Sequence, residues 1–456
     1  MLIHKLDNVE VNLENGHKYA LRDIKKGENV IKYGNPIGHA TADIAKGEHV
    51  HTHNLATNLS DNLTYTYEGP QPLPAPRTCN KTFWGYVRPN GDVGIRNEIW
   101  IVNTVGCVNK ISERLAALTG AYAFPHPFGC SQLGDDQGIT QKILCGLVKH
   151  PNAGGVLVLG LGCENNNIEE FKKVLGEYDP ERVKFLNCQD VEDEIKAGVA
   201  LIEELDAYAS RCERVELPAS RLCVGLKCGG SDGYSGITAN PLVGRFCDAL
   251  TQMSGSCVLT EVPEMFGAEH LLMQRCVNRE VFDKTVSLIN DFKDYYKRHG
   301  QVVYENPSPG NKKGGITTLE EKSLGCVQKG GSAPVVDVLK YGETVSKNGL
   351  SLLDGPGNDI VAITNLTAAG AHLILFTTGR GTPLGAPVPT VKVATNRALA
   401  EHKSKWIDFD ASPVLSGEDI DEAFLDHVLE VASGKETKNE KHNYREISIF
   451  KDGVTL

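Results

Sequence analysis

The chain has 456 residues, of which 41% are hydrophobic and 23% charged, a balance typical of a folded globular protein. Lys and Arg number 47 against 58 Asp and Glu, and the net charge of -11 disfavours general binding to nucleic-acid phosphates. The 13 cysteines, and a start MLIHKLDNVE without a basic segment followed by an apolar one, predict reduced thiols and a cytoplasmic location. No apolar stretch approaches the roughly 18 residues of a membrane span.

The order of predicted elements divides the chain into four parts. Residues 1–68 are expected to form a small β-rich unit, and the proline-rich residues 69–79 a stiff linker. Beyond it, strands alternate with helices, which indicates α/β layers with largely parallel sheets. We expect a first α/β domain over 80–219, a second over 220–456, and a last strand in EISIF (446–450). The predicted buried strands are 154–160, 183–187, 221–227 and 372–378, and the main helices are 190–209 and 280–298.

Alternating histidines mark the end of the β-rich unit, in GEHVHTHNL. In an extended segment His51 and His53 project from the same face, and His49 shares it. Such a pair of imidazoles suits metal ligation.

Glycine–cysteine pairs recur where predicted strands end, as in NTVGC, HPFGC and LGLGC. Ligands gather beyond the carboxyl ends of parallel strands, so several of these cysteines are expected to rim one cavity. Candidates are Cys130, which has His126 nearby, and Cys163, which adjoins Glu164. Five cysteines are instead expected to act as small buried hydrophobic residues, namely Cys107, Cys145, Cys212, Cys247 and Cys276. The chain has no CxxC motif, which argues against a zinc ribbon and weakens, without excluding, an iron–sulfur cluster.

The segment KCGGSDGYSGITANP follows a strand and precedes a predicted helix. Its backbone amides and Lys227 predict a cradle for a small anion. Arg380, in the similar loop TTGRGTPLG, and Lys392 add cations that can hold a carboxylate. Glu261 and Glu264 come just after another strand, and carboxylates with imidazoles suit Fe(II) or Mn(II).

Three functions are compatible with these residues. The first is a metal-assisted lyase that removes a proton next to a substrate carboxylate. The second is an iron–sulfur hydro-lyase with dispersed cysteine ligands. The third is a non-catalytic sugar-acid binding protein, which the many reactive side chains in glycine-rich loops disfavour.

The chain resembles the altronate/galactarate dehydratase family along nearly its whole length. The resemblance rests on long blocks in one order, which are VHTHN, FWGYVRPNGDVGIRNEIWIVNTVGCVN, HPFGCSQ, LGLGCENN, LKCGGSDGYSGITANPLVG, TEVPEMFGAE, NPSPGN, GGITTLEEKSLGCVQKGG and TTGRGTPLG. It implies an N-terminal SAF-type β-clip domain joined to an α/β dehydratase body. The implied reaction is the dehydration of D-altronate to 2-dehydro-3-deoxy-D-gluconate in hexuronate breakdown, with galactarate or another aldonate or aldarate as alternative substrates.

The resemblance also implies a divalent metal, Fe(II) or Mn(II), and roles for particular residues. The expected metal ligands are His51 and His53, with Cys163 and Glu164 as further partners. The candidates for proton transfer are Lys227, His126, Glu261 and Glu264. Substrate binding is assigned to Gly229, Gly230, Ser231, Asp232, Ser235, Arg380 and Lys392. A small sugar acid is the expected partner, with no nucleic acid or membrane, and the sequence leaves a homo-oligomer open.

Overall fold

The N-terminal unit is built from short antiparallel strands. A computed structural model describes residues 1–59, 63–70, 75 and 81–456. Two three-stranded sheets form, in the orders β1-β2-β5 and β3-β4-β6. The similar phrases DIKKGENV and DIAKGEHV meet at Ile24 and Ile44, whose backbones exchange two hydrogen bonds of 2.9 Å. The strands are β1 (Val9–Val11), β2 (Lys18–Ala20), β3 (Asn29–Lys32), β4 (Asn35–Ala40), β5 (His49–Val50) and β6 (Leu55–Ala56).

A second unit contains a four-stranded parallel sheet in the order β10-β9-β11-β12. Every residue of β11 is buried, as expected for a central strand covered on both faces. The strands are β9 (Glu98–Asn103), β10 (Tyr122–Phe124), β11 (Ala153–Gly160) and β12 (Val183–Asn187). The helices are α1 (Asn109–Thr119), α2 (Asp135–Lys149), α3 (Ile168–Leu175) and α4 (Glu194–Ala209).

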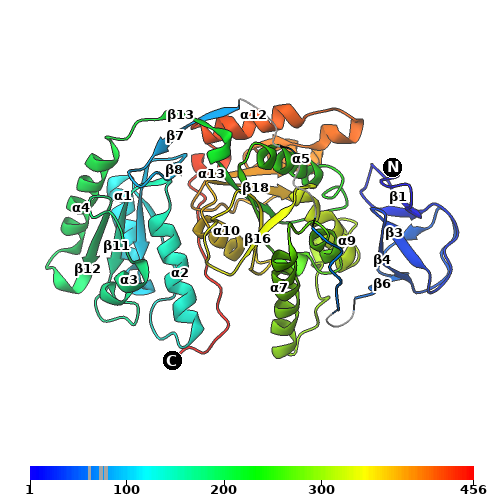
Figure 1. The fold of residues 1–456 in the computed structure, drawn as a ribbon, viewed down its shortest axis with the longest axis horizontal. Coiled ribbons are helices and arrows are strands. Elements are labelled where there is room, and N and C mark those ends of the chain that lie inside the picture. The colour runs from blue at the N-terminus through cyan, green and yellow to red at the C-terminus, as the bar shows by residue number, and fades with distance from the viewer. Residues whose placement is uncertain (60–62, 71–74, 76–80) are drawn as a thin grey trace.

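A seven-stranded parallel sheet occupies the centre of the molecule (Figure 1), in the order β16-β17-β15-β14-β18-β19-β20. Its strands are β14 (Cys223–Cys228), β15 (Ser256–Leu259), β16 (Val335–Leu339), β17 (Gly349–Leu353), β18 (Leu373–Thr378), β19 (Thr390–Ala394) and β20 (Phe409–Asp410). The surrounding helices are α5 (Ala239–Gln252), α6 (Glu269–Met273), α7 (Arg279–Arg298), α8 (Pro309–Lys313), α9 (Leu319–Cys326), α10 (Asp359–Ala368), α11 (Arg397–His402), α12 (Asp421–Ala432) and α13 (Lys438–Lys441).

A small antiparallel sheet, in the order β13-β7-β8, joins the two α/β units. Its strands are β7 (Thr82–Val87), β8 (Val93–Gly94) and β13 (Val215–Pro218). Helix α12 packs on this sheet (Figure 1), where the Ser433 hydroxyl accepts a 3.0 Å bond from the Trp84 amide. The chain therefore enters and leaves the second unit through one sheet.

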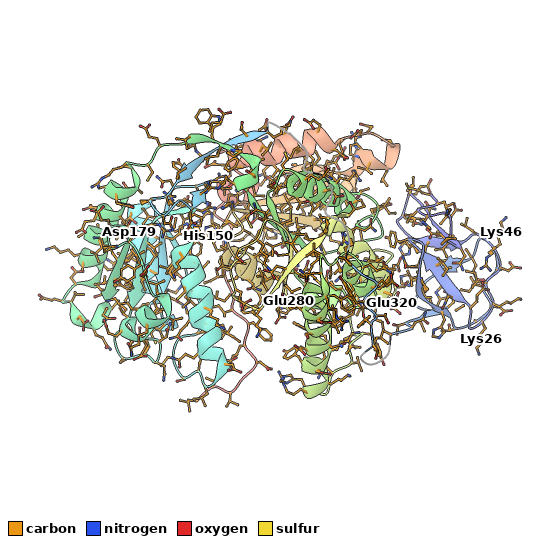
Figure 2. The ribbon with its side chains drawn as sticks, in the orientation of Figure 1. Lys26, Lys46, His150, Asp179, Glu280 and Glu320 are labelled. Atoms are coloured by element: carbon orange, nitrogen blue, oxygen red, sulfur yellow. The ribbon has the colours of Figure 1, made fainter. Side chains whose placement is uncertain are left out.

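The N-terminal unit docks on the body through helix α9. Glu321 of α9 accepts bonds of 2.8 Å from both Lys18 and Lys32, and all three side chains are buried. The neighbouring Glu320 binds the Thr57 hydroxyl and the Asn58 amide, and Figure 2 shows Glu320 on the side of the body that faces this unit. The N-terminal unit is thus fixed to the helix by buried charges.

The sequence anticipated most of this architecture. The four predicted strands correspond to β11, β12, β14 and β18, and the two predicted helices to α4 and α7. The strand expected at 446–450 is wrong, because the segment pairs with no strand and the amides of Ser448 and Phe450 bind the side chains of Thr364 and Tyr341. Most of the proposed linker lies outside the described residues. Among the helices that the structure describes, none is long and apolar enough to span a bilayer.

Candidate functional site

Buried charges and thiols gather where β14, β15 and α9 meet. Strand β14 ends on Lys227 and Cys228, and the turn after β15 carries Glu261 and Glu264. Helix α9 and the turn that follows it bring the remaining members. We call this set the thiol–lysine cluster, and its members are Lys227, Cys228, Glu261, Glu264, Lys322, Cys326 and Lys329, all of them buried.

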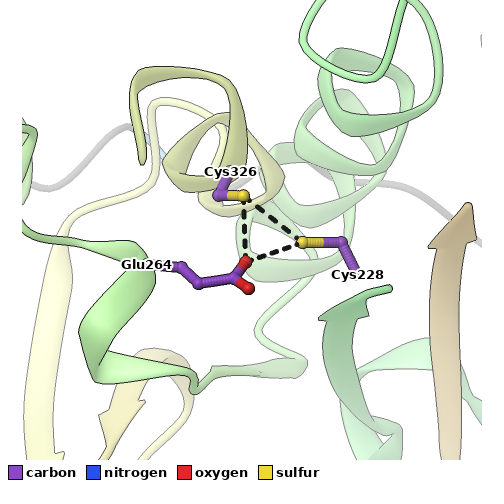
Figure 3. Close-up of side chains that lie close together, drawn as sticks. All are labelled: Cys228, Glu264 and Cys326. Carbon is purple, nitrogen blue, oxygen red and sulfur yellow. Dashed lines mark hydrogen bonds between the residues drawn. The ribbon is translucent and has the colours of Figure 1, made fainter. Parts of the chain in front are cut away.

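Two thiols and one carboxylate lie within contact of one another at the centre of the cluster (Figure 3). The sulfur atoms of Cys228 and Cys326 are 3.3 Å apart, and each lies 3.1 Å from Oε2 of Glu264. Among the described residues, these three are the group of ligand atoms close enough together to hold one metal ion. Thiolates suit zinc or iron better than they suit manganese or magnesium.

Lys227 is fully buried and held by carboxylates. Its ammonium donates to Glu261, to the Cys228 carbonyl and, over 2.8 Å, to Oδ1 of Asp359. Burial alone would lower the pKa of Lys227, but these nearby negative charges raise it above its ordinary value. Lys227 therefore stays a cation, and it holds Asp359 at the start of α10.

The pKa values of the two carboxylates of the cluster are shifted in opposite directions. Burial and repulsion from Glu264 raise the pKa of Glu261. Burial also acts to raise the pKa of Glu264, but Lys322, Lys227 and Lys329 together bring it below its usual range. Sites that perform proton chemistry often contain two acids whose pKa values are shifted in opposite directions by their surroundings.

Lys322 and Lys329 complete the charge arrangement. Lys322 Nζ lies 2.7 Å from Oε1 of Glu264, and Lys329 Nζ lies 2.8 Å from the Cys228 sulfur. The hydrogen bond between the two thiols and burial raise the pKa of the Cys326 thiol. With both thiols protonated, the three lysines outweigh Glu261 and Glu264 by one charge. A divalent cation fits here if its binding releases both thiol protons, because the total charge then stays constant.

A cavity of about 630 Å³ opens beside the cluster, within the size range of small-molecule sites. Glu264 and Lys322 form its inner wall, and Asp359 and Asn306 contribute polar groups. The Lys227 and Glu261 side chains are not among the lining residues. The cavity therefore offers a ligand one ammonium group, on Lys322, and three carboxylates, on Glu264, Glu305 and Asp359. Lys227 and Glu261 lie behind them.

The glycine-rich loop after β14 borders this cavity through Gly229 and Gly230. Other expected binding residues of the loop have structural partners. The buried Asp232 accepts bonds from the hydroxyls of Ser235 and Thr395 and from the Asn396 amide. The Ser231 carbonyl accepts a 2.8 Å bond from Asn311. Asp232 and Ser235 therefore shape the loop, and their role in substrate binding stays a prediction.

The two more distant cations occupy different surroundings. Arg380 is exposed, and its guanidinium lies 3.5 Å from the Gly310 carbonyl of α8. Lys392 is buried, donates to the carbonyls of Thr382 and Leu384, and lies over the Phe376 ring. Burial lowers the pKa of Lys392 to about 7. Neither side chain lines the cavity, so their role as substrate ligands stays a prediction.

The expected residues of the second unit lie far from the cluster. His126 is buried, its Nε2 lies 2.8 Å from the Asn103 carbonyl, and its Nδ1 accepts from the Phe128 amide. Both ring nitrogens are engaged by the backbone, and the role of His126 in proton transfer stays a prediction. Figure 1 places the four-stranded sheet that bears it at one end of the molecule, away from α9.

The proposed four-residue metal set is not brought together. Glu164 accepts bonds from the Thr104 hydroxyl and the Leu161 and Gly162 amides, so it closes its own loop. Cys163 is exposed on the same unit. His51 and His53 belong to the N-terminal unit at the opposite end (Figure 1). The structure does not bring these histidines together with Cys163 and Glu164, and their joint role as metal ligands stays a prediction.

The histidines themselves form a cluster with a fourth member, His17. His49 Nε2 lies 3.0 Å from Nδ1 of His17, and its ring stacks on His51 with centroids 5.4 Å apart. His51 Nε2 lies 2.9 Å from the Lys312 carbonyl, and the His53 ring lies 5.7 Å from that of His49. Burial and repulsion from the neighbouring rings lower the pKa of His49 to about 4. The His49 imidazole is thus neutral near pH 7, and ring nitrogens of His17, His49 and His51 are engaged within the protein.

Sequence reasoning missed Lys322, Cys326, Lys329 and Asp359 as members of the site. All eight residues of α9 are buried although its sequence, LEEKSLGC, contains three charges. Lys and Glu are almost never fully buried unless they are paired. The signal available in the sequence was a short helix that contains charged residues but no clear polar face. The residues that pair with these charges are distant in sequence, so the sequence could not identify them.

Comparison with known proteins places the chain in a family. The altronate/galactarate dehydratase SAF domain matches residues 2–58, the second domain of D-galactarate dehydratase/altronate hydrolase matches 85–210, and the C-terminal domain of D-galactarate/altronate dehydratase matches 219–455. The chain belongs to the altronate/galactarate dehydratase family. The family expected from the sequence is confirmed, and the similarity to altronate dehydratases supports a hydro-lyase.

Relatives within the dehydratase family match over nearly their whole length. An altronate dehydratase of Bacillus subtilis (strain 168) is 54% identical, over 98% of this chain and 93% of the relative. An altronate dehydratase of Escherichia coli (strain K12) is 52% identical, over 100% and 99%. A galactarate dehydratase (L-threo-forming) of the same organism is 34% identical, over 93% and 87%.

Proposed function

We propose that the chain dehydrates D-altronate to 2-dehydro-3-deoxy-D-gluconate in the cavity beside the thiol–lysine cluster. The observation that carries this proposal is the meeting of Lys322, Glu264 and Asp359 at one cavity wall. Dehydration of a sugar acid needs a cation for the carboxylate and a base for the proton at C2. The two relatives above 50% identity are named for the same substrate.

In the proposed mechanism, Lys322 binds the substrate carboxylate. Its ammonium already pairs with Glu264 and lies 3.2 Å from Oδ1 of Asn306. Negative charge develops on that carboxylate as the C2 proton leaves, and a fixed ammonium in a partly dry cavity stabilises it. Asn306 and Glu264 keep the ammonium at one position, so little reorganisation is needed during the reaction.

Asp359 is the proposed base. Its side chain is 38% exposed, lines the cavity, and is held by Lys227. The carboxylate takes the C2 proton, the C2–C3 double bond forms, and the C3–oxygen bond breaks. The same proton passes from Asp359 to the departing hydroxyl, which leaves as water, and the enol becomes the 2-keto acid. General acid–base help of this kind contributes on the order of 10²–10⁴-fold in rate. Lys227 acts as a positioning residue.

For the divalent metal we favour the sulfur atoms of Cys228 and Cys326 with the Glu264 carboxylate. The three ligand atoms lie in contact with one another. Thiolates favour Fe(II) over Mn(II). A divalent ion bound there would supply positive charge next to the forming enolate. The histidine cluster is the alternative site, and a metal there would have to replace the bonds that His17 and His51 now make.

The activity test is formation of a 2-keto-3-deoxy acid from D-altronate, with galactarate and other aldonates in parallel and with Fe(II) or Mn(II) added. We expect Asp359→Asn to lower kcat by at least 10²-fold with little change in fold. The matched control is Asp283→Asn, an exposed carboxylate of α7 paired with Arg279, which should keep full activity. No keto acid from any of these substrates would refute the proposed function, and an unchanged rate in Asp359→Asn would refute the role of that residue.

The metal site has its own test. Iron bound after dialysis should fall in Cys228→Ser and Cys326→Ser and should be retained in His49→Ala and His53→Ala. The reverse pattern would move the metal to the histidine cluster.

A further inference from the structure

Three exposed cysteines follow three adjacent strands of the second unit. The order β10-β9-β11 places the ends of these strands side by side. Cys107 follows β9, Cys130 follows β10 and Cys163 follows β11, and each is preceded by glycine. Among the cysteines that the structure describes, these three are the exposed ones. Cys107 was expected to be buried, and that expectation is wrong.

The three loops that carry these cysteines are bound directly to one another. The Gly106 amide donates a 2.9 Å bond to the Phe128 carbonyl, two residues before Cys130. The Asn166 amide donates a 3.0 Å bond to the Gly129 carbonyl, and the Asn166 side chain donates to the Thr104 carbonyl. Each loop is therefore held by residues within three positions of its cysteine.

The glycines before the cysteines are required by this close contact. A Cβ atom at Gly129, which has a φ of +99°, would lie 1.9 Å from the Thr104 carbonyl oxygen. A Cβ at Gly106 would lie 2.8 Å from the His126 carbonyl oxygen. In these two Gly-Cys pairs, the glycine allows two backbones to approach closely, and the cysteine places a thiol at the carboxyl edge of the sheet.

Polar groups surround the sulfur atoms. The Cys130 thiol lies 3.5 Å from Oδ1 of Asn165, and the Cys163 sulfur lies 3.6 Å from the amide nitrogen of Gln189. The Gln189 amide donates to the Cys163 sulfur, and N–H groups that donate to cysteine sulfur are a means by which proteins tune iron–sulfur clusters. The Asn165 oxygen instead accepts from the Cys130 thiol. The rim also lies at the carboxyl edge of a parallel sheet, where α/β proteins bind their ligands.

We propose that Cys107, Cys130 and Cys163 form a binding site for an iron–sulfur cluster. The sulfur atoms of these three described cysteines do not all lie within 4.8 Å of one another. They are therefore too widely spaced to bind one ion together. A cubane cluster separates its cysteine ligands more widely, because each thiolate binds a different iron. Three thiolates leave the fourth iron open to an oxygen ligand. This site is separate from the proposed active-site cavity and does not depend on the proposed function.

The test is anaerobic reconstitution of the full chain with ferrous iron and sulfide, followed by desalting. We expect about four iron and four acid-labile sulfide per chain and a broad absorbance near roughly 400 nm. Each of Cys107→Ser, Cys130→Ser and Cys163→Ser should lose most of this absorbance. Cys212→Ser is the matched control, because Cys212 is half-buried at the end of the same unit, and it should keep the full signal.

Several results would overturn the proposal. They are a colourless wild-type protein after reconstitution, iron bound without sulfide, and an unchanged chromophore in the triple serine variant. Circular dichroism of each variant separates loss of the cluster from loss of the fold. The readout is iron and sulfide content, so it stands whether or not altronate is a substrate.

Discussion

The buried charges between the N-terminal unit and α9 allow a quantitative prediction for Glu321→Gln. In the wild type, one carboxylate balances two buried ammonium groups, on Lys18 and Lys32, over 2.8 Å each. The variant keeps the shape and a hydrogen-bond acceptor but removes the negative charge. Breaking a buried ion pair in this way typically costs about 3–5 kcal/mol, because an uncompensated charge remains.

A second route gives a similar magnitude. Burial, the largest effect, lowers the pKa of Lys18 to about 8 even with Glu321 present. Without that carboxylate the folded variant is expected to release the Lys18 proton. Releasing a proton from a lysine of ordinary pKa near 10.4 at pH 7 costs about 4.6 kcal/mol, at 1.36 kcal/mol per pH unit. The two estimates agree, and they set an upper range for the penalty.

The free-energy cost of Glu321→Gln should become smaller as the pH rises. Below pH 8, folded wild type and its unfolded chain both hold the Lys18 proton, so that group contributes no slope. In the variant the folded state lacks this proton while the unfolded state has it, so the stability of the variant rises with pH. The difference between wild type and variant should therefore shrink by about 1.4 kcal/mol between pH 6.5 and 7.5.

The assay is amide hydrogen exchange of the native full chain, because a chain with several units does not unfold in one step. Opening free energies at α9 and at β2 should fall by the predicted amount in Glu321→Gln. Glu320→Gln is the matched control, since its partners are the Thr57 hydroxyl and the Asn58 amide, and it should cost only about 1 kcal/mol. Equal effects of the two substitutions, or a penalty that does not change with pH, would refute the reasoning.

Two further substitutions test buried acid chemistry and loop packing. Burial and the charge of Asp291 raise the pKa of Asp354 to about 6, so the folded state holds this proton above the ordinary carboxyl pKa and loses stability as pH rises toward 6. Asp354→Asn should therefore raise the melting temperature at pH 8 and leave it unchanged at pH 4, as calorimetry can show; an equal effect at both pH values would contradict this. Gly129→Ala places Cβ against Thr104 at a positive φ, and we expect the opening free energy from hydrogen exchange to fall by several kcal/mol in the second unit. Gly138→Ala, which has open space around it on α2, should change the same quantity by less than about 1 kcal/mol.

The sequence predicted the parallel sheets and the strand ends with more success than the site. Runs such as GGVLVLG are short, apolar and flanked by turn residues, so a local pattern is enough to identify β11. The Gly-Cys pairs correctly marked the ends of strands. Their grouping could not be predicted, because the local sequence does not show that Cys163 follows a strand of the four-stranded sheet whereas Cys228 ends a strand of the seven-stranded sheet.

The site was only partly predictable for a related reason. Lys227, Glu261 and Glu264 were identified because they follow strands, where ligands are expected. Lys322 and Cys326 belong to a helix whose partners come from the N-terminal unit and from distant segments in the middle of the chain. Local periodicity carries no information on such contacts.

Helix α9 explains why the N-terminal unit belongs to the functional molecule. Its Glu321 is held by Lys18 and Lys32, and the next residue, Lys322, forms the cavity wall with Glu264. In a helix of eight buried residues, a shift at one position moves its neighbours as well. The N-terminal lysines therefore help to fix the ammonium group proposed to bind the substrate, although no residue of that unit lines the cavity. Substitutions at this interface should affect kcat through the position of Lys322 before they affect the fold of the body.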